Sequence, residues 1–360
     1  MKNSEKRAEG TYKNKELDGL CTRWGSNGQK MAEENYKDGT RKLQANPEKL
    51  VRQDSASRVS PLFANQERIR GDWYTLGRSR QVKSGAVSPF FVGSKKLVLC
   101  RDGDGRFIAQ EPACPHTGAD LSQGQVVDNS LRCAFHHWRF DGGGRCIDAP
   151  TCELPPDLRL RCYPTEERWG LMWVFLDRTF RPLPDGHESL SKVILTPSQT
   201  LRAHPHLVIG NGFDVSHLGP VHRMELSGEV SCEQAHEHGL TLKYEAQFTQ
   251  RYKRVLTGST GEGLSVTFMS DGGSFALLTV TKPFLFQTVF TARPRTNGGT
   301  ATQLAILLPP SRPDRWIRAM LALMFLLADD KKILDAIDFS PGWVPSDAVL
   351  RKFFRVVNAE

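Results

Sequence analysis

Long hydrophobic runs are missing from this chain of 360 residues. The longest strongly apolar stretch, Ala319 to Ala328, has ten residues, whereas a transmembrane helix needs about twenty. The first thirty residues are polar throughout and lack the apolar segment of a signal peptide. The eight cysteines also lack the dense spacing of a small secreted domain. We therefore expect a cytoplasmic protein without a membrane span.

Residues 1 to 71 differ from the rest of the chain because hydrophobic periodicity is nearly absent there. The first seventy residues hold fifteen Lys and Arg against ten Asp and Glu, with four aromatic residues. Such a segment buries too little apolar surface to offset the entropy of ordering it. Acids interrupt the basic residues and the aromatics are not patterned for base stacking, so we expect no nucleic-acid partner. The sequence predicts a loosely ordered basic extension.

Two short segments each combine one cysteine with one histidine. Cys114 and His116 are separated by one residue, and Cys133 and His136 by two. A Rieske [2Fe-2S] cluster needs this mixture, with two Cys on one iron and two His on the other. Zinc is the competing interpretation, but zinc fingers usually place two Cys in one step and two His in another. The mixed steps, flanked by glycines, favour the cluster on two facing loops.

These segments resemble the cluster loops of Rieske non-haem iron oxygenases, over Cys114 to Leu121 and Cys133 to Phe140. The second loop departs from the family at Ala134, where a proline is usual. The family's spacing makes His136 the ligand, and we expect its neighbour His137 to have a packing role. The likeness extends over about 72 to 360 and is nearest to the branch of aminopyrrolnitrin oxygenase, steroid 9α-hydroxylases and vanillate demethylases.

A second motif matches the oxygenase signature of that family, in which Asn and Asp precede two histidines. Here these residues are Asn211, Asp214, His217 and His222. Two imidazoles and one carboxylate can hold a ferrous ion and leave positions open for oxygen. A lone pair of histidines at this spacing is more often structural, but its place after a Rieske motif favours metal binding. The resemblance implies that Asn211 helps shape the site.

The third ligand can be sought on a long amphipathic helix predicted from Pro313 to Ile337. Asp330 lies within its apolar stripe, where an unpaired carboxylate is costly unless it binds a metal. Asp335 has Lys331 among its helical neighbours and is expected to face water. The family pattern also places the third ligand in a segment like the one that begins at Asp330, and Asp329 remains the alternative.

The pattern of strands and helices predicts an α+β fold with two folded domains. An all-β Rieske domain is expected over 72–178. It should contain a hairpin of strands 90–100 and 106–110 that turns at 102–105, and a closing strand at 170–176. A catalytic domain of the helix-grip type, an antiparallel sheet plus helices, is expected over 179–360. Its predicted strands are 240–248, 264–269, 275–280, 288–292 and 302–308, separated by glycine-rich turns.

The resemblance implies a terminal oxygenase that oxygenates a small, largely apolar organic substrate by hydroxylation, N-oxygenation or demethylation. Electrons from NAD(P)H would pass through a flavin reductase, often with a ferredoxin, to the cluster and then to Fe(II), which binds O2. It also implies a homotrimer, in which Asp214 bridges a cluster histidine of one subunit to an iron-binding histidine of the next. The alternative is a Rieske electron-transfer protein with a vestigial iron site.

Overall fold

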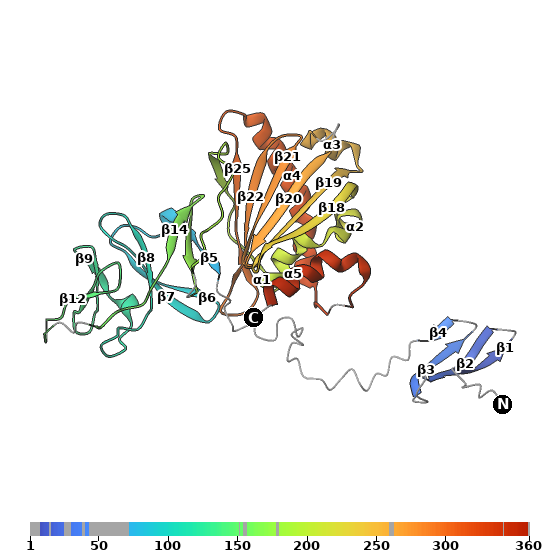
Figure 1. Cartoon of the computed structure of the whole chain (residues 1–360), viewed down its shortest axis with the longest axis horizontal. Coiled ribbons are helices and arrows are strands. Elements are labelled where there is room, and N and C mark those ends of the chain that lie inside the picture. The colour runs from blue at the N-terminus through green and yellow to red at the C-terminus, as the bar shows by residue number, and fades with distance from the viewer. Residues whose placement is uncertain are drawn as a thin grey trace. The chain divides into compact units, whose positions relative to one another are not determined.

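The structure, a computed structural model, describes residues 72–150, 152–153, 157–177, 180–258, 263–340 and 342–358, and the backbone of strands between 8 and 42. The chain separates into two compact units, Met1–Arg58 and Val59–Glu360 (Figure 1). Within the described residues, no helix is both long and apolar enough to span a membrane.

The first unit contains a four-stranded antiparallel sheet in sequential order. Its strands are β1 Ala8–Lys13, β2 Glu16–Trp24, β3 Lys30–Lys37 and β4 Thr40–Lys42. The sequence predicted a loosely ordered extension over residues 1–71, whereas the structure has these four strands between residues 8 and 42. Residues 43–71 lie outside the described part. A sequence signal was available, because the Asp-Gly pair at 38–39 is typical of a two-residue hairpin connection, and β3 and β4 pair with Lys37 opposite Thr40.

Three small antiparallel sheets form the first part of the second unit. One consists of β5 Trp73–Arg78, β14 Thr165–Arg168 and β15 Leu171–Phe175. The next consists of β6 Val87–Val92, β7 Lys95–Arg101, β8 Phe107–Gln110 and β13 Cys162–Tyr163. The third consists of β9 Gln125–Val127, β10 Ser130–Arg132, β11 Arg139–Phe140 and β12 Cys146–Asp148. This part is all-β, as predicted.

The predicted hairpin between β7 and β8 is present, but the segment before it is divided differently. Residues 90 to 100 were expected to form one strand, whereas they belong to β6 and β7, which pair antiparallel. The chain reverses at Gly93, whose φ of 57° lies in the left-handed region. Glycine adopts this conformation without the steric cost that other residues incur. The Gly93 amide also donates a hydrogen bond to the Pro294 carbonyl at 2.9 Å.

A seven-stranded antiparallel sheet with helices forms the rest of the unit (Figure 1). In spatial order its strands are β16 Lys192–Leu195, β25 Leu304–Leu308, β22 Phe286–Thr291, β21 Phe275–Lys282, β20 Leu264–Asp271, β19 Gly239–Phe248 and β18 Met224–His236. A smaller sheet contains β17 Gln199–Leu201, β23 Arg293–Pro294 and β24 Thr300–Thr302. The predicted strands are all present, except that 302–308 is divided between β24 and β25. Strands β16, β17 and β23 were not predicted, and β18 was missed because most of its side chains are not buried, which removes the alternating pattern.

Helix α4 spans Pro313–Ala336 and ends one residue before the predicted limit. Its buried residues include Ala319, Leu323 and Leu334, which join the main hydrophobic core over the sheet. The other α-helices of the described residues are α1 Pro205–Gly210, α2 Leu218–His222, α3 Arg251–Thr257 and α5 Ala348–Asn358. The fold is therefore α+β, with an all-β part followed by a sheet covered by helices, as the sequence predicted.

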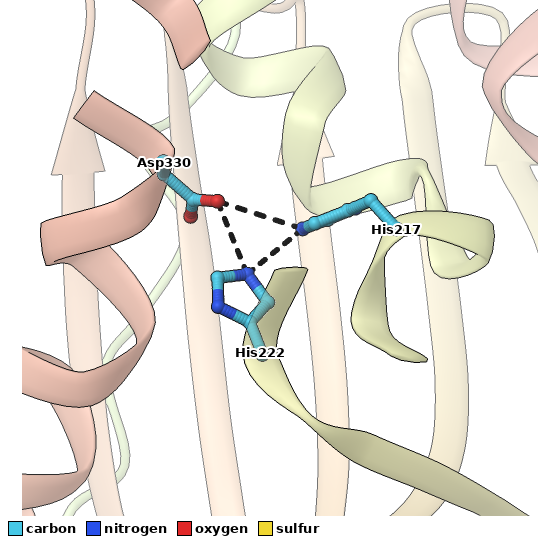
Figure 2. A group of neighbouring side chains, drawn as sticks. All are labelled: His217, His222 and Asp330. Atoms are coloured by element: carbon cyan, nitrogen blue, oxygen red, sulfur yellow. Dashed lines mark hydrogen bonds and ion pairs between the residues drawn. The ribbon is translucent and has the colours of Figure 1, made fainter. Parts of the chain in front are cut away.

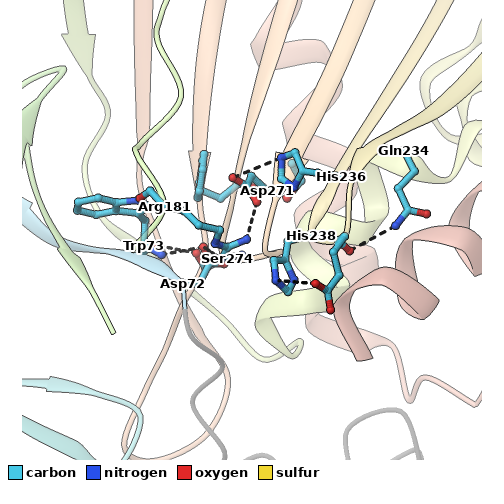
Figure 3. A network of polar contacts seen from close by, with 11 residues as sticks. Asp72, Trp73, Arg181, Gln234, His236, His238, Asp271 and Ser274 are labelled. Atoms are coloured by element: carbon cyan, nitrogen blue, oxygen red, sulfur yellow. Dashed lines mark hydrogen bonds and ion pairs between the residues drawn. The ribbon is translucent and has the colours of Figure 1, made fainter. Parts of the chain in front are cut away.

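A buried polar network joins the two parts of this unit (Figure 3). The Asp72 carboxylate accepts hydrogen bonds from the amides of Trp73, at 2.7 Å, and Ser274, at 2.9 Å. Arg181 lies 3.9 Å from the same carboxylate and pairs with Asp271 at 2.7 Å. A side chain at position 272 would collide with the Asp72 carboxylate, so this close approach requires Gly272. The network fixes the start of β5 against the end of β20.

Complete burial raises the pKa of Asp72 to about 7, against the opposing effect of its hydrogen bond from Ser274 and the charge of Arg181. Because the unfolded carboxyl ionises near 3.8, the folded state holds the extra proton between about pH 4 and pH 7. The free energy of unfolding should therefore fall as pH rises through that window. Asp72→Asn removes this titration, so we expect its denaturation midpoints to show a shallower slope against pH. An unchanged slope would assign the titration to another group.

Candidate metal centres

The two Cys-His segments form matching loops. In the first, the Cys114 amide donates to the Ala119 carbonyl at 2.8 Å, and in the second the Cys133 amide donates to the Trp138 carbonyl at 2.9 Å. Each of these hydrogen bonds joins the cysteine to the residue five positions later. In both loops, the residue four positions after the cysteine has a left-handed backbone conformation. Gly118 holds that position in the first loop and His137 holds it in the second. The sequence thus repeats one backbone turn with different residues.

His137 therefore has a backbone role that the sequence did not predict. Its φ is 62° and its side chain is exposed, which contradicts the expected packing role. The side chain of His137 points into solvent, and His136 is the histidine of the second loop that faces the first loop. The centre of its ring lies 4.7 Å from that of the His116 ring. The His116 ring in turn stacks on Trp138 at 4.1 Å, which fixes its orientation.

The four loop side chains fit a Rieske cluster. Cys114 and Cys133 are almost completely buried, and burial raises the pKa of the Cys114 thiol to about 11. Thiols in such a position are poor thiolates unless a metal replaces the proton. The His116 Nδ1 atom is buried without a hydrogen-bond partner. Two buried thiols and two adjacent imidazoles supply the complete ligand set for a [2Fe-2S] cluster.

Two histidines and one aspartate meet on the helical side of the seven-stranded sheet (Figure 2). His217 ends the short helix Val215–His217, His222 ends α2, and Asp330 projects from α4. The Nε2 atoms of the histidines are 3.0 Å apart. Asp330 Oδ1 lies 3.1 Å from Nε2 of His222 and 3.7 Å from Nε2 of His217. These three residues are called the triad below.

The triad fits a single metal ion. Neighbouring ligands on metal–nitrogen bonds of about 2.1 Å lie roughly 3 Å apart when their bonds meet at right angles, close to the separations observed. His222 Nδ1 and Asp330 Oδ1 are buried without hydrogen-bond partners. The Nδ1 atom of His217 instead contacts the Asp214 carbonyl, which favours a proton on Nδ1 and leaves Nε2 free for the metal. Two His and one carboxylate are typical of non-haem iron sites.

Electrostatics agree with neutral imidazole ligands. Burial lowers the pKa of His217, although the charge of Asp330 opposes this effect. Asp329, the alternative ligand, does not belong to the group of three. Asp335 accepts a hydrogen bond from the Arg202 amide at 3.0 Å and pairs with Lys331. The structure thus brings Asp330, and not its acidic neighbours, to the two histidines.

Asp214 and Asn211 lie beside the triad without joining it. The Asp214 carboxylate accepts a hydrogen bond from the Ser216 amide at 3.0 Å and caps the helix that carries His217. Its side chain remains 25% exposed. Both residues line the cavity next to the triad. The bridging role expected for Asp214 involves a second subunit and stays a prediction.

A cavity of about 420 Å³ opens on the triad. Its walls are mainly apolar and include Phe268, Leu278, Phe290 and Ile306. Tyr244 is one of the polar residues of the cavity and was not predicted from the sequence. Burial raises its pKa, and the nearby charge of Asp330 adds to this effect, so the hydroxyl stays protonated. The signal was present, because strand alternation places Tyr244 on the same face as Leu242 and Ala246, both of which are buried.

Comparisons with known proteins agree with a Rieske domain in the first part of the second unit. The family model of the Rieske [2Fe-2S] domain matches residues 72–164. Aminopyrrolnitrin oxygenase of Pseudomonas fluorescens is 28% identical over 49% of this chain and 53% of its own length. The chloroplastic protein TIC 55 of Pisum sativum is 35% identical over 31% of this chain and 21% of its own length. The chain thus matches about a fifth to about half of the length of these curated relatives.

A crystal structure of dicamba monooxygenase bound to dicamba has a similar fold. The match covers 80% of this chain and 96% of the dicamba monooxygenase chain, with a TM-score of 0.61 and 20% sequence identity. The likeness thus extends over the sheet and helices that hold the triad as well as the Rieske domain. The predicted resemblance to Rieske oxygenases is confirmed at the level of the Rieske domain and the overall fold.

Proposed function

We propose that this chain, which carries a Rieske [2Fe-2S] domain on the fold of Rieske oxygenases, is the terminal component of a multi-component oxygenase. The observation that carries this proposal is the triad at the wall of an apolar cavity. An electron-transfer protein with a vestigial site has no need of three convergent ligands or of a cavity beside them. The proposed substrate is a small, largely apolar organic molecule.

The two Cys-His loops would hold the cluster, which would supply single-electron transfer, and the triad would hold ferrous iron, which would supply a site for O2. The protein supplies position and environment. Asp214 holds the imidazole of His217 through its backbone carbonyl and caps the helix behind it. Apolar walls at Phe268 and Phe290 keep water from the substrate. The protonated Tyr244 hydroxyl offers one hydrogen bond to a polar substituent.

We further propose that reducing equivalents come from NAD(P)H through a separate flavin reductase, with or without a ferredoxin, and that the chain works as a homotrimer. The partly exposed carboxylate of Asp214, next to His217, supports a contact with a neighbouring chain. We propose Cys114, His116, Cys133 and His136 as cluster ligands. We propose His217, His222 and Asp330 as iron ligands, and Asn211 as a residue that shapes the cavity.

The test supplies the iron-loaded protein with NADH, a bacterial Rieske reductase and ferredoxin, and ¹⁸O2. Probes are an aromatic amine, an aryl methyl ether and a steroid, and His217→Ala is run in parallel. We expect O2 consumption that depends on His217, and ¹⁸O in the product of at least one probe. If the cluster is reduced but the wild type and His217→Ala consume O2 equally and form no product, the oxygenase proposal is wrong.

A further inference from the structure

Helices α3 and α4 expose several large apolar side chains. Six of them, each between 38% and 64% exposed, form what is called the α3–α4 face below: Tyr252, Val255, Leu256, Ile317, Met320 and Met324. Single exposed apolar residues are common on protein surfaces, but a contiguous group marks an interaction site.

These side chains belong to one surface because the two helices pack together. The Arg318 guanidinium donates a hydrogen bond to the Val255 carbonyl at 3.1 Å. The Tyr252 ring meets the Phe325 ring edge-on at 6.2 Å. Along α4, spacings of three and four residues place Ile317, Met320 and Met324 on the same side of the helix. The α3–α4 face is therefore continuous across the pair of helices.

The face also reaches the cavity beside the triad. Met320 and Met324 are exposed on the surface and line the cavity as well. Leu323 and Leu327 continue the apolar lining from these two methionines towards Asp330. An apolar molecule on the surface could thus reach the triad without crossing a polar barrier on α4.

Positive charge accompanies the apolar side chains. Arg251 and Arg254 lie on α3, and Arg315 and Arg318 lie on the first turns of α4. No acid occurs in 251–257. The one acid from 313 to 328 is Asp314, which pairs with Arg312 at 2.9 Å. The apolar surface therefore carries an excess of guanidinium groups.

We propose that the α3–α4 face docks on an anionic lipid surface, from which apolar molecules enter the cavity. Apolar side chains within a basic surround are typical of proteins that lie on a membrane without crossing it. A second copy of the chain fits less well. A contact of this face with its own copy would bring its arginines together, and the proposed homotrimer is expected to form its contact at Asp214 instead. Docking is independent of the proposed oxygenase activity and can be tested without it.

The test is sedimentation of the purified full chain with phosphatidylcholine vesicles that contain or lack phosphatidylglycerol. We expect the protein to bind vesicles with phosphatidylglycerol and to be released by high salt, which screens the arginines. The double substitution Val255→Asp and Ile317→Asp should lower the partition coefficient about tenfold or more, because it removes apolar area and adds negative charge. Neither residue belongs to the metal sites or lines the cavity.

The control is Phe91→Asp, which changes an apolar residue on β6 that is 40% exposed and lies outside the α3–α4 face, and it should leave vesicle binding unchanged. Circular dichroism confirms that each variant is folded. The proposal is overturned if the wild type ignores anionic vesicles, or if Phe91→Asp loses as much binding as the double variant. It is also overturned if sedimentation velocity shows that the wild type is a complex of identical chains and that the sole effect of the double substitution is to dissociate this complex. A second copy of the chain would then cover the α3–α4 face.

Discussion

Asp330→Ala will abolish product formation while leaving the Rieske absorbance and its electron-spin signal intact. The carboxylate is the only anionic ligand of the triad, and its loss leaves two neutral imidazoles for the ferrous ion. The cluster loops share no residue with this site, so the cluster should remain reducible. We expect turnover to fall below detection and the iron content to drop by about one atom per chain. Product assays and metal analysis on the same sample measure both effects.

Two further variants separate metal binding from general damage to α4. Asp329→Ala removes the adjacent acid, which lies outside the triad, and should retain turnover. Asp330→Asn keeps one oxygen but loses the charge, so weak metal binding with little activity is expected. Full turnover by Asp330→Ala together with its loss in Asp329→Ala would transfer the ligand role to the neighbouring residue.

Asp214→Ala will leave both metal centres loaded but slow electron delivery to the triad by orders of magnitude. The proposed reason is that the partly exposed carboxylate reaches a cluster histidine of a neighbouring subunit and couples the two centres. The Asp214 carbonyl, which holds His217, belongs to the backbone and survives the substitution. Rapid reduction of the cluster, followed by exposure to O2 with substrate, measures its reoxidation rate.

The structure also gives Asp214 a capping role, so the control must preserve the cap. Asp214→Ser keeps an oxygen that can accept from the Ser216 amide but lacks the reach and charge of a carboxylate. If coupling is the main role, Asp214→Ser should be as slow as Asp214→Ala. If capping is the only role, the serine variant should reoxidise at the wild-type rate, and Asp214→Ala should lose only about 1 kcal/mol of stability.

The sequence predicted most of the candidate sites because their signals are local. Residue type and spacing in the two loops indicate a Rieske cluster, since each loop supplies one Cys and one His, whereas zinc fingers usually place two Cys in one step and two His in another. Asp330 was predicted as the third ligand from helical periodicity, because a carboxylate within an apolar stripe is costly without a partner. The structure places this residue 3.1 Å from His222, a contact across 108 positions that spacing alone does not reveal.

Other features escaped prediction because they depend on tertiary structure or on weak patterns. Strand β18 is mostly unburied, so its sequence carries little alternation of apolar and polar residues. The backbone position of His137 becomes visible only when the two loops are compared in space. The cavity wall is assembled from residues far apart in the chain, and Tyr244 enters it through the register of β19. The contact between Asp72 and Ser274 likewise joins distant segments.

Metal and sulfide analysis of the purified chain tests the central claim most directly. One cluster and one triad predict about three irons and about two acid-labile sulfides per chain. Cys114→Ser should remove about two irons and both sulfides, while Asp330→Ala should remove one iron and no sulfide. A wild-type protein with one zinc and no sulfide, or with a cluster but no third iron after anaerobic loading with Fe(II), would contradict the account.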